Sequence, residues 1–79
     1  MEKRGRFDSC MTFLTSAEAA ERQARIADED KNKMLSQLKW QETLQQTNNA
    51  ISASVCDGLY LKRLQNLQVV SKRRLDKQQ

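Results

Sequence analysis

The chain has no histidine and no proline, and it contains only two glycines and two cysteines in 79 residues. Without histidine, the commonest general base and metal ligand is missing, and two cysteines are too few for a structural zinc site. The sequence also lacks a glycine-rich phosphate loop and a paired-carboxylate signature. We therefore expect a non-enzymatic protein with no bound metal, no cofactor and no small-molecule substrate.

The two cysteines, Cys10 and Cys56, lie far apart, and the N-terminal segment up to Leu14 only faintly resembles a secretion signal. Basic residues there are followed by a short apolar group, but Asp8 and Thr12 interrupt the pattern. No apolar run is long enough to span a bilayer. We expect two reduced thiols in a cytoplasmic protein, or in a particle that assembles inside the cell. A single disulfide between the two cysteines is the alternative.

The missing proline and the positions of the only glycines, Gly5 and Gly58, leave a long stretch in which little interrupts a helix. Alanine, glutamine, lysine, arginine and glutamate dominate this stretch, and all of them are good helix formers. Residues that favour strands are sparse. The sequence therefore predicts an all-α fold.

The expected fold is an antiparallel two-helix hairpin that resembles a coiled coil. A capping box from Thr15 to Glu18 predicts where the first helix begins. Weak helix residues and Gly58 then predict a turn. The expected segments are an N-terminal arm (1–14) and a hairpin (15–79) with a first helix over about 16–47, a turn within 47–58 and a second helix over about 59–77. The alternatives for the turn are a break at Asn48 and Asn49, a break at Asp57 and Gly58, and one continuous rod.

The apolar residues of the expected first helix fall on two roughly opposite faces. The first stripe consists of Ala17, Ala20, Ala24, Ala27, Met34, Leu35 and Leu38, and the second consists of Ile26, Trp40 and Leu44. One short second helix covers only one face, and a chain of this size hides only about 60% of its unfolded surface. We therefore expect both stripes to be protein interfaces, one of them with another molecule. The simpler alternative is that Trp40 folds over a lysine stem on a solvated face.

The expected second helix has an apolar face and a basic face. Its basic residues are Lys62, Arg63, Lys72, Arg73, Arg74 and Lys77. Such a face can bind nucleic acid, but Tyr60 is the only aromatic residue in this helix and no nucleic-acid-binding motif is present. Binding to an anionic membrane surface is less well supported, because the apolar face is needed inside the hairpin.

The predicted function is that of a helical protein-interaction module, which self-associates or binds a larger partner as an adaptor, structural subunit or inhibitor. The alternative is a nucleic-acid-binding accessory protein that uses the basic face of the second helix. Small helical proteins are frequent among phage and mobile-element products, but no residue demonstrates such an origin. Steep salt dependence would distinguish phosphate binding from apolar association.

Overall fold

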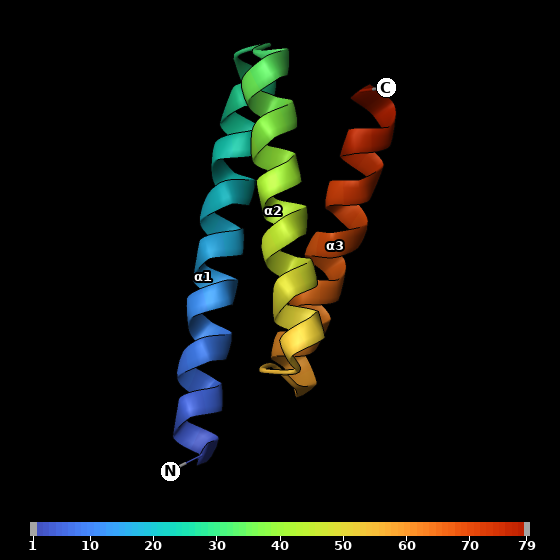
Figure 1. Cartoon of the computed structure of the whole chain (residues 1–79). Coiled ribbons are helices and arrows are strands. Elements are labelled where there is room, and N and C mark those ends of the chain that lie inside the picture. The colour runs from blue at the N-terminus through green and yellow to red at the C-terminus, as the bar shows by residue number, and fades with distance from the viewer. Residues whose placement is uncertain (1, 79) are drawn as a thin grey trace.

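The computed structural model of the chain describes residues 2–78, and within them it contains three helices: α1 (Glu2–Glu29), α2 (Lys33–Ala53) and α3 (Gly58–Gln78). Successive helices run in opposite directions, with α2 packed against both α1 and α3 (Figure 1). The bundle is elongated, at 45 × 17 × 16 Å. The all-α class is confirmed, whereas the predicted two-helix hairpin is wrong. Met1 of the predicted arm and Gln79 of the predicted hairpin lie outside the described residues.

Helix α1 begins before the predicted capping box, so the segment expected to be an arm is helical from Glu2 onward. Thr15 and Glu18 lie inside this helix, and the Glu18 carboxylate accepts a hydrogen bond from Arg63 of α3 at 2.5 Å. Cys10 and Leu14 extend the buried face of α1 toward the N-terminus. Tertiary burial of an amphipathic face contributes more to helix stability than local capping does, which explains the early start.

Residues 30–32 interrupt the predicted first helix, and this break was not expected. Lys31 adopts a left-handed conformation with φ of 58°. Asn32 caps α2, because its side-chain oxygen accepts the backbone N–H of Leu35 at 3.2 Å. Asparagine is among the best N-cap residues and a poor residue inside a helix. Glu29 therefore ends one helix and Lys33 begins the next.

The second connection lies inside the interval in which a turn was expected. Ser54 is left-handed, with φ of 54°, and its N–H donates to the Ile51 carbonyl at 3.1 Å. Gly58 also has a positive φ of 56°, which glycine adopts without the steric cost of a Cβ atom. Asn48 and Asn49 are helical. The break at these asparagines and the continuous rod are therefore both wrong, and the break lies on the Gly58 side.

The interior is apolar at one end and contains both apolar and polar side chains toward the other. The apolar cluster contains Cys10, Leu14, Ala17, Ala50, Cys56, Leu64 and Leu67. Toward the other end, the buried residues include Trp40, Ser36, Thr43 and Thr47. The two threonine hydroxyls donate to carbonyls of their own helix, at 2.8 Å each. Ser71 Oγ is buried and has no hydrogen-bond partner among the residues that the structure describes.

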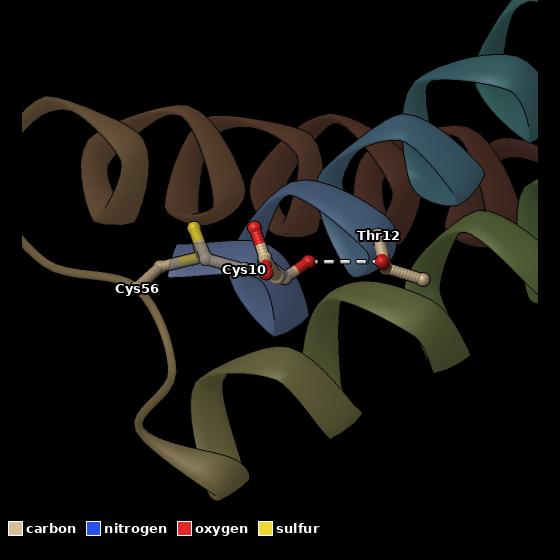
Figure 2. Close-up of a disulfide and its surroundings, with 4 residues drawn as sticks. Cys10, Thr12 and Cys56 are labelled. Atoms are coloured by element: carbon tan, nitrogen blue, oxygen red, sulfur yellow. Dashed lines mark hydrogen bonds between the residues drawn. A yellow bond between two sulfur atoms is a disulfide. The ribbon is translucent and has the colours of Figure 1, made fainter. Parts of the chain in front are cut away.

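A disulfide joins Cys10 of α1 to Cys56, which lies in the connection between α2 and α3 (Figure 2). Their Cα atoms are 5.0 Å apart, and 46 positions separate them in the sequence. The expectation of two reduced thiols is therefore wrong. Spacing alone could not reveal the pair, because their proximity depends on a third helix that the predicted hairpin lacked. Cross-linking a loop of this length stabilises a fold by about 4 kcal/mol in the chain-entropy model.

Within residues 2–78, none of the helices has the length and apolar character needed to cross a membrane. This finding agrees with the short apolar runs of the sequence.

Candidate functional site at the open end of the bundle

Polar contacts converge on Asp28, near the end of α1. Its carboxylate accepts hydrogen bonds from Trp40 Nε1 at 3.1 Å and from the Ser36 hydroxyl. The Arg74 guanidinium of α3 lies 3.8 Å from the same carboxylate. Asp28 therefore links all three helices at the end opposite the disulfide.

The Trp40 ring is fully buried and lies near two guanidinium groups. Arg25 of α1 is 5.8 Å from the ring centroid, and Arg74 is 5.7 Å from it. Both distances lie within the range in which a cation is attracted to an aromatic face. The ring is thus held by Asp28 at its edge and by two cations from two different helices.

A cavity of about 340 Å³ opens beside this cluster, between the α1–α2 turn and the C-terminal part of α3. Figure 1 shows that the turn and the C-terminal end of α3 lie at the same end of the bundle. The lining residues are Ala27, Asp28, Lys31, Asn32, Lys33, Ser36, Arg74 and Lys77. Four of them are cationic and one is a carboxylate, so the lining carries a clear positive excess.

Among the described residues, Arg74 is the one cation of this lining that has an ion-pair partner. Arg74 is paired with Asp28, but Lys31, Lys33 and Lys77 make no ion pair with any residue of the described chain. The cavity lies at the N-terminus of α2 and beside the last turns of α1 and α3, so the helix dipoles there have opposite signs and the side chains determine the charge. By contrast, a smaller cavity of about 180 Å³ between α1 and α3 contains Arg63 together with its own partner, Glu18. Positive potential is therefore concentrated in the larger cavity.

The outward face of α2 is the second notable surface. It lies opposite the buried face of this helix, and its residues are Met34, Leu38, Gln41, Gln45, Asn49 and Ser52. We call it the uncharged stripe. Every residue in it is exposed, and the two apolar members, Met34 and Leu38, are exposed to 85% and 58%. An apolar pair on a helix face without charge is a candidate contact surface.

The structure divides the two predicted apolar stripes between the interior and the surface. Ala17, Ala20, Ala24, Ala27 and Trp40 are buried within the chain, whereas Ile26, Met34, Leu35 and Leu38 are exposed and Leu44 is half-buried. The cause is the break at residues 30–32, which places the alanines on α1 and the later members on α2. The alanines and Trp40 are therefore covered by the chain's own helices and are not free to contact another molecule.

The basic residues predicted for nucleic-acid binding do not act as one face. All six (Lys62, Arg63, Lys72, Arg73, Arg74 and Lys77) are exposed. However, Arg63 pairs with Glu18, and Arg74 pairs with Asp28. Arg74 and Lys77 join Lys31 and Lys33 at the cavity, a grouping that sequence reasoning missed. The sequence feature that indicates this grouping is Asn32, which lies between two lysines. Asparagine favours the N-cap of a helix, and the lysines place positive charge beside that helix start.

The chain matches no protein-family model, no curated protein and no solved structure with which it was compared. Its function must therefore be inferred from its own surfaces. The two candidate surfaces are the uncharged stripe of α2 and the larger cavity. We call this cavity the basic cavity, and we call the end of the bundle where it lies, opposite the disulfide, the open end.

Proposed function

We propose that the chain is a non-enzymatic helical interaction module that self-associates through the uncharged stripe of α2. The observation that carries this proposal is the exposure of Met34 and Leu38 on a face without charge. Burying one such side chain contributes about 1.5–3 kcal/mol. Association would remove both from water.

A second copy of the chain is the partner that fits this face best. The stripe offers no charge with which a charged partner could pair, and the chain is strongly basic elsewhere, with a net charge of +4. The same stripe on another copy is equally uncharged, so two α2 helices can meet without like charges facing each other. A two-fold axis near Met34 and Leu38 would bring the apolar side chains of both copies together.

The expected complex is weak. A helix of 21 residues is about 31 Å long, so a face about 10 Å wide offers roughly 300 Å² per copy. Stable complexes bury about 800 Å² per partner, which places this contact in the transient class. We expect dissociation constants of about 0.1–1 mM.

Sedimentation velocity between about 10 µM and 1 mM tests the proposal. The average mass of the wild-type chain should rise with concentration, and Leu38→Glu should keep the protein monomeric because it places a charge in the stripe. Leu59→Glu is the matched control, since Leu59 is 76% exposed but lies on α3, outside the stripe. Helix content measured by circular dichroism should be the same in all three proteins.

Two results would contradict self-association. One is a wild-type chain that stays monomeric at the highest concentration. The other is a loss of mass that is as large in Leu59→Glu as in Leu38→Glu, because that would indicate nonspecific association of exposed apolar residues.

The alternative of nucleic-acid binding has weaker support. Lys62, Lys72 and Arg73 are exposed and could contact phosphates. The one aromatic residue of α3, Tyr60, is half-buried against the apolar cluster, so its ring is not free to stack on a base. This alternative stays a prediction, and steep salt dependence of binding to an oligonucleotide would be its mark.

The cytoplasmic location was expected because the N-terminal segment makes a poor secretion signal, and two reduced thiols were expected to accompany it. The disulfide argues against this location, because disulfides form and persist mainly in oxidising compartments. We propose that the chain functions where this bond can form. Alkylation of thiols in freshly lysed source cells, followed by mass measurement, should find Cys10 and Cys56 protected.

A further inference from the structure

We infer that the basic cavity at the open end binds the phosphate group of a small anionic molecule. Three lysines without ion-pair partners in the described chain reach this cavity from two sides: Lys31 and Lys33 from the start of α2, and Lys77 from α3. Arg74 contributes a fourth cation. Like charges that line one concavity repel one another, and a bound anion removes that repulsion.

A phosphate group suits this set of donors. Lysine ammonium groups bind phosphate as compact charges, and guanidinium groups donate to it in a planar fork. The N-terminus of α2 lies at this cavity together with the last turns of α1 and α3, whose dipoles have the opposite sign, so the positive charge comes from the side chains. The Asp28 carboxylate pairs with Arg74 and offsets one of the four positive charges, so the three lysines make up the positive excess of the lining.

The size and shape of the cavity indicate a small ligand. At about 340 Å³ it lies at the lower end of the volumes typical of small-molecule sites, which run from about 300 to 1,000 Å³. Its cations converge on one concavity, whereas a membrane or a nucleic-acid strand needs cations spread along a surface. The site is separate from the uncharged stripe, so this inference goes beyond the proposed self-association. The sequence predicted no small-molecule substrate, and the inferred ligand is bound without being transformed.

Trp40 provides a direct readout, because it is the only tryptophan in the chain and its ring contacts Arg74 of the cavity lining. Inorganic phosphate is titrated at constant ionic strength, with sodium chloride as the compensating salt. We expect saturable changes in Trp40 fluorescence and in the backbone amide NMR signals of residues 31–33, with a dissociation constant of about 1–10 mM. The protein is kept dilute so that self-association does not contribute.

Single lysine substitutions test whether phosphate binds in this cavity. Lys31→Gln and Lys77→Gln should each weaken phosphate binding about fivefold, which corresponds to the loss of one nearby charge. Lys62→Gln removes an exposed lysine of α3 that does not line the cavity, and it should bind phosphate as the wild type does. The three substituted lysines are solvent-exposed, so the fold should be unchanged in circular dichroism.

Two further arms distinguish the source of the phosphate group. Vesicles of phosphatidylglycerol and phosphatidylcholine, and a short single-stranded oligonucleotide, are compared with inorganic phosphate at equal phosphate concentration. Saturation by free phosphate that the cavity variants weaken supports the inference. It is overturned if free phosphate produces no saturable change up to about 50 mM, if only vesicles or oligonucleotide bind, or if Lys62→Gln weakens binding as much as the cavity variants.

Discussion

Asp28 illustrates how much one side chain contributes to the open end of the bundle. Its carboxylate is the hydrogen-bond acceptor for the indole of Trp40 and the hydroxyl of Ser36, both of which are buried. A buried donor left without an acceptor costs the desolvation energy of that group. The stability of this end should therefore depend on Asp28 more than on any of the exposed charged pairs.

Replacing Asp28 by alanine tests this dependence. We expect the free energy of unfolding to fall by about 1–3 kcal/mol, because the buried indole N–H of Trp40 loses its acceptor. Asp28→Asn keeps an acceptor oxygen and should cost less than Asp28→Ala. Urea unfolding monitored by circular dichroism gives both values, with Glu29→Ala as the control at the neighbouring exposed position. Equal stability of Asp28→Ala and the wild type would refute this role.

At the residue scale, the sequence predicted which faces are apolar but not what covers them. The spacing of Ala17, Ala20, Ala24 and Ala27 identified a face that is in fact buried, and Leu64 and Leu67 likewise lie inside. The polar cluster was not predictable, because Asp28, Trp40 and Arg74 meet only through tertiary packing.

The main error in the predicted fold was a missed connection between two helices, at residues 30–32. Lys31 and Asn32 form a capped turn, but charged residues on both sides made this region resemble an exposed helical surface. Joining α1 and α2 into one helix then left only two helices to place. The second connection was easier to predict, because Gly58 and its polar neighbours interrupt the pattern of good helix formers.

The disulfide makes a prediction at this scale, since it fixes the N-terminal half of α1 to the connection that precedes α3. Reduction should lower the free energy of unfolding by about 2–4 kcal/mol. Chemical unfolding of the oxidised protein, the reduced protein and the Cys56→Ala variant measures the effect. Reductant should not change the stability of Cys56→Ala, which serves as the control.

A different result would contradict the disulfide itself. If unreduced protein reacts with a thiol reagent in the folded state, or if reduction leaves the unfolding midpoint unchanged, Cys10 and Cys56 are not paired in solution.

The two ends of the molecule differ: a disulfide cross-links one end, and buried polar side chains lie toward the other. The disulfide and the apolar cluster of Leu14, Leu64 and Leu67 lie at one end. At the other end the interior contains polar side chains, and a cavity separates α3 from the α1–α2 turn. Regions with fewer buried apolar contacts open at lower free-energy cost.

Amide hydrogen exchange should reveal this gradient. Amides of α1 near Leu14 and of α3 near Leu64 should exchange more slowly than those near Asp28 and Arg74. Mass spectrometry of peptides after timed exchange measures the difference, and short intervals at low protein concentration avoid the effect of self-association. Uniform protection along α1 and α3 would show that the two ends are equally stable.

The position of Cys56, directly before α3, has a mechanical consequence. The covalent bond holds the base of this helix, two residues before Gly58, and the ion pair of Arg74 with Asp28 connects the far part of the helix to α1. A helix of 21 residues is about 31 Å long, so a tilt of about 5° displaces its far tip by about 3 Å. Arg74 and Lys77 lie near that tip. A rotation of α3 about its base would therefore displace Arg74 and Lys77 more than the residues near Cys56.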